Sequence, residues 1–203
     1  MRQLFSIGIG GAHSGVGKTT IAVALLKYLT RLAENPFTDS PTPKWGAIKF
    51  TKTDLYSSIS DDKEILNQEN KDTRRLLNAG AEEVLWVQSP ENQVDEVMSM
   101  AIFRLSHLDG IIIEGNSAIE FARPDIVIFL HDPSQDNIKS SAQRVLKQAD
   151  IIIVPDKRIS GNLSETDDKK TIFEVKRSKK GMDERTTIKL IDCMEKIIKG
   201  KKV

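Results

Sequence analysis

The sequence has little of what would tie it to a membrane or to an oxidising compartment. It holds one cysteine, Cys193, which cannot form an internal disulfide, and its three histidines make no Cys/His cluster for zinc. The longest apolar runs, residues 111–113 and 151–154, fall far short of the ~20 residues that span a membrane. The apolar stretch after Met1 is too short for a signal peptide. We therefore expect a cytoplasmic protein with no membrane association.

What is present is the composition of a globular domain. Of 203 residues, 39% are hydrophobic and 29% are charged, which is enough to bury a core without a disulfide or metal. Residues 155–203 carry 14 basic and 9 acidic side chains, whereas the rest of the chain carries 16 basic and 20 acidic ones. We predict a single domain over residues 1–203, with 155–203 a basic C-terminal extension or edge element. Because its lysines alternate with acids, we expect a solvated surface, and nucleic-acid binding is not favoured.

Short apolar runs alternate with segments of helical periodicity along the whole chain. The runs predict strands at residues 4–9, 45–50, 83–87, 108–113, 125–130, 150–154 and, at an edge, 172–175. The periodic segments predict helices at residues 18–32, 72–79, 93–105, 135–148 and 183–199. The connections are residues 34–44, 51–70 (with room for one helical turn) and 160–171. This order predicts an α/β fold, a mostly parallel sheet flanked by helices on both faces.

One motif carries specific chemistry. Residues 12–19, Ala-His-Ser-Gly-Val-Gly-Lys-Thr, match the Walker A pattern with Ala12 in place of the usual first glycine. Such a loop turns backbone N–H groups around a di- or triphosphate, and the helix that follows points its positive end at the same anion. Lys18 adds a charge at the terminal phosphates, and the Thr19 hydroxyl is placed to ligate Mg²⁺. We predict a P-loop NTPase fold with nucleotide-binding residues Ala12, His13, Ser14, Gly15, Val16, Gly17, Lys18, Thr19 and Thr20.

A Walker loop also needs an acid at the end of a neighbouring strand. Glu114 ends the predicted strand 108–113 and is followed by Gly115, so we expect it to hold the metal together with Thr19 and to act in catalysis. Asp109 opens the same strand and should lie at the opposite edge of the sheet. Asp54, in the loop after the second strand, is a further catalytic candidate for orienting water or metal.

The histidines carry weaker predictions. His13 stands inside the loop, where a related class of ATPases has a second lysine that reaches across a dimer. Its presence argues against that lysine-finger mechanism, and it either touches a phosphate or faces solvent. His107 and His131 lie beside strands with no partner in the sequence, and we expect structural roles for both.

Three stretches together resemble one family. They are residues 11–20, then Lys71-Asp72-Thr73-Arg74-Arg75 running into Ala79-Gly80-Ala81, and then Glu114-Gly115. In this order they resemble the molybdopterin-guanine dinucleotide biosynthesis protein B (MobB) family of P-loop GTPases, and Trp45 to Lys49 resembles its second strand. The resemblance spans roughly residues 1–130. The loop alone is also similar to those of cobyrinic acid diamide synthase and dethiobiotin synthetase, which are ATP-dependent ligases.

The chain departs from that family in two places. Phe50, Thr51 and Lys52 follow Lys49, where the family often has histidines. The Asn-Lys-x-Asp signature that recognises guanine is absent, and residues 154–157, Val-Pro-Asp-Lys, have only a weak similarity to it. The nucleotide is therefore either GTP or ATP, with GTP favoured by the resemblance.

Three functions remain open from the sequence. The resemblance implies an accessory NTPase in molybdenum-cofactor biosynthesis, slow in hydrolysis without a partner, which would be a nucleotidyltransferase. The alternatives are an ATP-dependent ligase or kinase, and a nucleotide-switched module that recruits a partner through the basic tail. Lys71, Asp72 and Arg75 are predicted to line a second site for an anionic substrate; the alternative is a surface ion-pair cluster.

Assembly is the last expectation. Relatives of the superfamily tend to work as homodimers with their nucleotide sites near the shared face, and the resemblance implies the same here. The C-terminal helix carries more apolar residues than one narrow stripe requires, so it should pack either on its own sheet or on another subunit. These residues are Ile188, Leu190, Ile191, Met194, Ile197 and Ile198.

Overall fold

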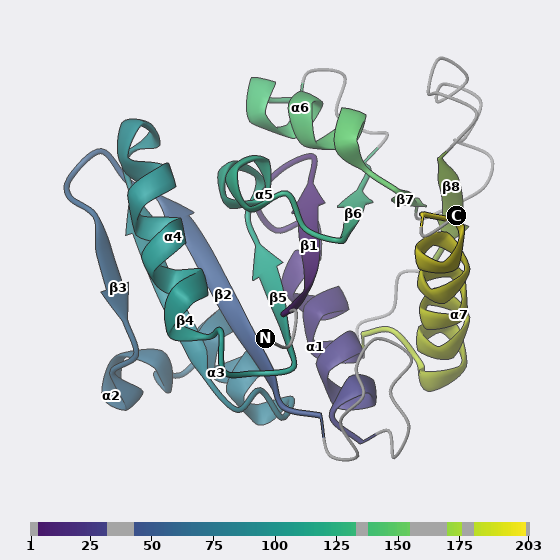
Figure 1. The fold of residues 1–203 in the computed structure, drawn as a ribbon, viewed down its shortest axis with the longest axis horizontal. Helices are drawn as coiled ribbons and strands as arrows, with labels where there is room; N and C mark the ends of the chain where they lie inside the picture. Colours follow the sequence, from purple (N-terminus) through teal and green to yellow (C-terminus); the bar gives the residue numbers. More distant parts are fainter. Residues whose placement is uncertain (1–3, 32–42, 133–137, 155–169, 176–180, 202–203) are drawn as a thin grey trace.

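Eight strands form one sheet in the order β3-β4-β2-β5-β1-β6-β7-β8 (Figure 1). The computed structural model describes residues 4–31, 43–132, 138–154, 170–175 and 181–201. All neighbouring strands are parallel except β3, which runs antiparallel to β4. The bounds are β1 (Phe5–Gly11), β2 (Trp45–Lys52), β3 (Ser58–Ser60), β4 (Val84–Ser89), β5 (Gly110–Glu114), β6 (Ile126–Leu130), β7 (Ile151–Val154) and β8 (Thr171–Glu174).

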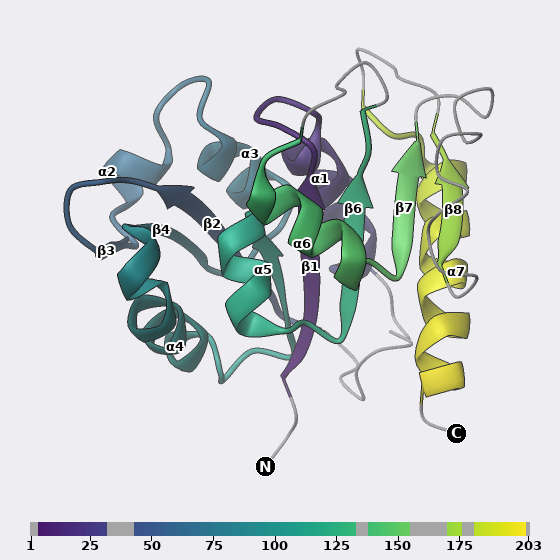
Figure 2. The same ribbon diagram turned by 90° about the horizontal axis from the view of Figure 1, so that it is seen from above.

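Helices cover both faces of the sheet (Figure 2). Helices α1, α3 and α7 share one face with the apolar side chains of a single large cluster, and α4, α5 and α6 lie on the other face. The bounds are α1 (Lys18–Leu29), α2 (Lys63–Leu66), α3 (Asp72–Asn78), the 3₁₀ turn η1 (Glu91–Gln93), α4 (Val94–Arg104), α5 (Asn116–Ala122), α6 (Ser140–Gln148) and α7 (Glu184–Lys201). This three-layer arrangement confirms the predicted α/β fold.

Two elements escaped prediction because each is short, whereas α2 is the single helical turn considered for residues 51–70. β3 lies inside the same polar stretch, which has too few apolar residues to show a period. α5 has seven residues and follows β5 after the single residue Gly115, whose φ of 135° allows the abrupt turn. The predictions for residues 34–42, 135–137 and 160–169 lie outside the described part of the chain.

The C-terminal helix packs on its own sheet. Leu190, Ile191 and Met194 of α7 are buried in the same cluster as Ile151 and Ile153 of β7, and α7 also packs against α1. Of the two alternatives for its apolar face, the structure therefore shows the packing within the chain. No helix among the described residues is long and apolar enough to cross a membrane.

Candidate functional site

The Walker loop connects β1 to α1 at the carboxyl edge of the sheet. Gly15 and Gly17 have φ of 80° and 111°, a left-handed conformation that glycine adopts without strain. Gly17 is the N-cap residue of α1, so the loop leads directly to the positive end of that helix. Ala12, the departure from the Walker pattern, is buried and its methyl group joins an apolar cluster with Phe129, which explains why a side chain is tolerated there.

The loop borders a cavity of about 570 Å³, within the size range of small-molecule sites. Of the predicted nucleotide-binding residues, all except Val16 line this cavity; Val16 packs against the core instead. Glu114, Asp72 and Arg75 also line it, whereas Asp54 and Lys71 do not. The cavity is lined further by residues that were not predicted, among them Lys49, Lys52, Asn116, Ser117, Lys139 and Ser141.

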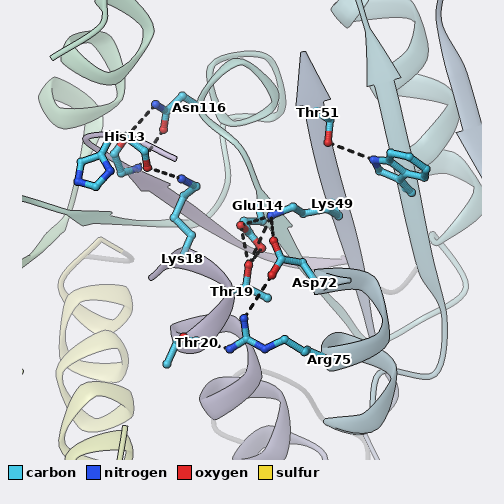
Figure 3. A network of polar contacts seen from close by, with 12 residues as sticks. His13, Lys18, Thr19, Thr20, Lys49, Thr51, Asp72, Arg75, Glu114 and Asn116 are labelled. Atoms are coloured by element: carbon cyan, nitrogen blue, oxygen red, sulfur yellow. Dashed lines mark hydrogen bonds and ion pairs between the residues drawn. The ribbon is translucent and has the colours of Figure 1, made fainter. Parts of the chain in front are cut away.

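A polar cluster, buried at Thr19 and Glu114 and more exposed at Asp72 and Arg75, forms the floor beside the loop (Figure 3). The Thr19 hydroxyl donates to both carboxylate oxygens of Glu114, at 3.0 and 2.9 Å. Lys49 Nζ lies 2.5 Å from Glu114 Oε1 and 2.7 Å from Asp72 Oδ2. Arg75 closes the cluster, with one nitrogen 3.2 Å from Asp72 Oδ1 and another 3.1 Å from Thr20 Oγ1. Residues from α1, β2, α3 and β5 thus meet at one point.

Strand register explains this meeting. Trp45 and Ala47 of β2 face the α1 side of the sheet, and alternation places Lys49 on that same face. Lys49 is paired in register with Glu114 of the neighbouring strand β5. On this face of the sheet, the apolar side chains of β2 and β5 are therefore followed, toward the carboxyl ends of the strands, by the charged pair Lys49 and Glu114. Glu114 is only 2% exposed, and a carboxylate buried to this extent requires the donors that Lys49 and Thr19 provide.

Lys18 and Lys49 differ in their electrostatics. Burial lowers the pKa of Lys49, but its attraction to Glu114 and its hydrogen bonds to Asp72 and Glu114 outweigh this, and the net pKa is raised. Burial raises the pKa of Asp72, but the hydrogen bond and charge of Lys49, with smaller contributions from Thr19 and Arg75, together outweigh this, and the net pKa is lowered. Burial lowers the pKa of Lys18, which reaches only the backbone oxygen of His13, at 2.9 Å.

Lys18 is held by a backbone carbonyl and not by a direct ion pair, although the charges of Glu114 and Asp72 attract it from further away. No carboxylate among the described residues forms an ion pair with it. Figure 3 shows it apart from the Lys49–Glu114–Asp72 group, reaching toward the loop backbone. A half-buried ammonium without a direct ion pair is a site for an external anion.

Two further contacts shape the loop. Asn116, the first residue of α5, exchanges two hydrogen bonds with the backbone of Gly11, each 3.0 Å long. His13 contacts Asp132 through Nε2 at 3.0 Å and the Ser14 carbonyl through Nδ1 at 2.7 Å. The bond to Asp132 raises the pKa of His13, with a further contribution from the Ser14 carbonyl. His13 therefore lines the cavity and also ties the loop to the residues after β6.

The structure separates several predicted residues from the cluster. Asp54 is exposed on the turn after β2, two residues beyond Lys52. Lys71 lies over the ring of Trp86, 4.6 Å from its centroid, away from Asp72 and Arg75. Asp109 lies at the opposite edge, as expected, and accepts from the backbone N–H of Lys44 at 2.8 Å.

The other two histidines also lie away from the cluster. His107 pairs with the half-exposed Glu83 at 2.7 Å. His131, next to Asp132, has its pKa lowered by burial. Neither lines the cavity, so both remain outside the candidate site.

Lys49 and Asn116 are the important residues that motif reasoning missed. Lys49 could have been found as the one charge inside a buried strand, next to a loop that binds phosphate. Asn116 carries no local signal, because its role depends on α5 beginning directly after Gly115.

The donor set suits a magnesium ion. Thr19 Oγ1 and the two oxygens of the Glu114 carboxylate are hard oxygen donors, and they lie 2.9–3.0 Å apart. Mg²⁺ in nucleotide sites takes one or two protein oxygens and completes its shell with phosphate and water oxygens. The residues present therefore fit this metal.

Comparison with known proteins supports the fold. No protein-family model matches the chain, and no curated protein was found to be similar in sequence. Among solved structures, HypB from Helicobacter pylori, crystallised with nickel, is similar with a TM-score of 0.58 at 15% identity, covering 98% of this chain and 88% of that one. A plasmid partition protein from Borrelia burgdorferi is similar with a TM-score of 0.51 at 17% identity, covering 98% and 100%. The chain has the P-loop NTPase fold.

Proposed function

We propose that this protein binds a nucleoside triphosphate with Mg²⁺ in the cavity beside residues 12–20 and hydrolyses it slowly in the cytoplasm. The observation that carries the proposal is Lys18, a half-buried ammonium with no direct ion pair, in a loop whose glycines take the left-handed conformation. An anion of several charges, cradled by backbone N–H groups, would supply the missing counter-charge.

The roles of the side chains follow from their positions. Lys18 would hold the terminal phosphates, while Thr19 and Glu114 would hold Mg²⁺, which neutralises phosphate charge when bound. Lys49 would present a second cation to the transferred group, because its ammonium is held at the cavity floor by Glu114 and Asp72. Phosphoryl transfer needs positioning and charge neutralisation more than covalent help. Glu114 would orient the attacking water, and Asp54 remains a proposed further acid.

For the biological role we propose an accessory NTPase of MobB type, acting as a homodimer with a nucleotidyltransferase partner in molybdenum-cofactor maturation. What supports this is the convergence of the resembling segments: residues 11–20 except Val16 line one cavity together with Lys49, Asp72, Arg75 and Glu114. GTP is the proposed nucleotide, on the resemblance alone.

A ligase or kinase acting on a small molecule is the second candidate. It is favoured by Arg75, whose guanidinium is about half exposed and lines the cavity next to Thr20. An arginine at that place suits an anionic acceptor beside the terminal phosphate.

Nucleotide binding tests the function directly. The melting temperature should rise when Mg·GTP or Mg·ATP is added. At a ligand concentration 100 times the dissociation constant, binding should increase the free energy of unfolding by about 2.7 kcal/mol. Titration calorimetry with both nucleotides would rank them, and tighter GTP binding would support the MobB-type role. If neither nucleotide binds in the presence of Mg²⁺, the proposal is wrong.

Arg75 allows a test of the second anionic site. Arg75→Ala should weaken binding of inorganic pyrophosphate about tenfold in protein saturated with a non-hydrolysable triphosphate, because a charge-assisted hydrogen bond is lost. Affinity for the nucleotide itself should change less than twofold. Arg74→Ala is the matched control, since Arg74 lies on the same helix but contacts Glu69 outside the cavity. Equal losses for both ligands would show a structural role.

A further inference from the structure

The ammonium group of Lys49 lies among the oxygens that the site offers to a metal ion. Its Nζ is 2.5 Å from Glu114 Oε1 and 3.4 Å from Thr19 Oγ1, and these are the two residues whose oxygens suit Mg²⁺. A third oxygen, Oδ2 of Asp72, is 2.7 Å from the same nitrogen. Figure 3 shows the three oxygen-bearing side chains pointing toward the end of Lys49. A cation that belongs to the protein itself is therefore bound to the predicted metal ligands.

Glu114 is the oxygen donor that depends most on a cation. Its side chain is 3% exposed, and a carboxylate buried to this extent is stable only beside donors or a positive charge. Among the described residues, Lys49 is the only one that forms an ion pair with it. An ammonium and a divalent ion cannot both contact one carboxylate oxygen at close range, because the two positive charges repel each other. Lys49 and a metal ion are therefore competitors for Glu114.

Asp72 offers Lys49 an alternative partner. Its side chain is 39% exposed, and its other carboxylate oxygen contacts Arg75 at 3.2 Å. The lysine side chain is a flexible four-carbon stem, so its ammonium can leave Glu114 and remain on Asp72 without a change in the backbone of β2. Because Lys49 lines the nucleotide cavity, the same movement also brings its charge within reach of bound phosphate.

We propose that Lys49 keeps free Mg²⁺ out of the site and gives way only to Mg²⁺ that arrives with a nucleotide. Without nucleotide, the ammonium of Lys49 balances the charge of Glu114. With Mg·nucleotide, Lys49 leaves Glu114, stays on Asp72 and gains the phosphate oxygens as new acceptors. Asp72 is then a positioning residue that holds Lys49 beside the phosphates. The inference rests on the proposed function for its nucleotide, but competition between Lys49 and a metal ion is measurable with no nucleotide present.

Metal binding in the absence of nucleotide tests this competition. Mn²⁺ is the probe, because it takes the same oxygen ligands as Mg²⁺ and its free concentration can be followed by electron paramagnetic resonance. Lys49→Met should bind Mn²⁺ at least about tenfold more tightly than the original chain, because a repelling charge is removed from the metal ligands. Lys49→Met should also melt at a lower temperature in EDTA, since Glu114 loses its cation, and Mn²⁺ or Mg²⁺ should raise that temperature again.

Lys52→Met is the matched control. Lys52 lies on the same strand and lines the same cavity, but its ion pair, at 2.6 Å, is with the exposed Glu91. Its replacement should leave Mn²⁺ affinity and the melting temperature in EDTA close to those of the original chain.

A double variant separates competition for the metal from loss of stability. K49M/E114Q removes both charges of the buried pair, so it should melt above Lys49→Met in EDTA and show no response to Mn²⁺. If Lys49→Met is unfolded in EDTA, folding on addition of Mn²⁺ is the expected result, and failure to fold with Mn²⁺ would overturn the proposal.

Three other results would contradict the role of Lys49. They are Mn²⁺ binding by the original chain as tight as that of Lys49→Met, a folded Lys49→Met that does not respond to Mn²⁺, and a response that persists in the double variant. Failure of the original chain to bind Mg·GTP or Mg·ATP is a different outcome. It would refute the proposed function, whereas the measurements with Mn²⁺ alone would still decide whether Lys49 competes with a metal ion.

Discussion

Replacing Lys18 by alanine is expected to abolish the rise in melting temperature that nucleotide produces, while leaving the melting temperature without nucleotide unchanged or slightly higher. Hydrogen bonds to charged groups contribute about 1.5–3 kcal/mol, so nucleotide affinity should fall about 100-fold. The effect on the free protein follows from the lowered pKa of Lys18, which means that the fold disfavours the ammonium. Removing the Lys18 charge is therefore not expected to lower the free energy of unfolding of the nucleotide-free protein.

The control for this experiment lies on the same helix. Lys27 is exposed in the last turn of α1, so Lys27→Ala should leave both nucleotide affinity and melting temperature unchanged. Calorimetric titration of both variants with Mg·GTP and Mg·ATP gives the comparison. If Lys18→Ala still binds Mg·nucleotide within about threefold of the original chain, the assignment of residues 12–20 to phosphate binding is wrong.

The sequence was sufficient for those features that depend on local pattern. The Walker loop is recognisable because its glycines, lysine and threonine lie within eight positions, between a strand and a helix. Glu114 follows from one further rule, that acids at the ends of buried parallel strands meet at the same edge. The fold class follows from the alternation of strands and helices, which the structure confirms.

The cluster around Lys49 could not be derived in the same way. It depends on β2 lying beside β5, although β3, β4 and three helices separate them along the chain. It also depends on register, because a slip of one residue would turn Lys49 to the opposite face.

The prediction for Lys71 shows a boundary effect. The spacing argument placed Lys71 and Arg75 on one side of a helix, but α3 begins at Asp72. Lys71 is the extended residue before it and turns to Trp86. One residue at a helix start thus decided which side chains reach the cavity.

Glu114→Gln is expected to retain nucleotide binding but to lower turnover about 100-fold, the contribution typical of a positioned acid or base. The amide keeps the shape of the side chain but removes the charge that Thr19 and Lys49 both contact. Lys49 remains held by Asp72, and its pKa should fall because attraction to Glu114 is the largest of the effects that raise it.

The opposite end of the same strand region offers a matched control for this variant. Asp109 is 8% exposed and accepts the backbone N–H of Lys44, far from the cavity. Asp109→Asn should therefore lower the melting temperature without changing turnover per folded molecule, measured as phosphate release at saturating Mg·nucleotide. Glu114→Gln should show the reverse pattern if Glu114 acts in catalysis: nucleotide affinity and melting temperature should be nearly preserved, and turnover should be lost. If Glu114→Gln keeps turnover within twofold of the original chain, Glu114 only supports the fold, and the water must be oriented by another acid, for which Asp54 is the next residue to test.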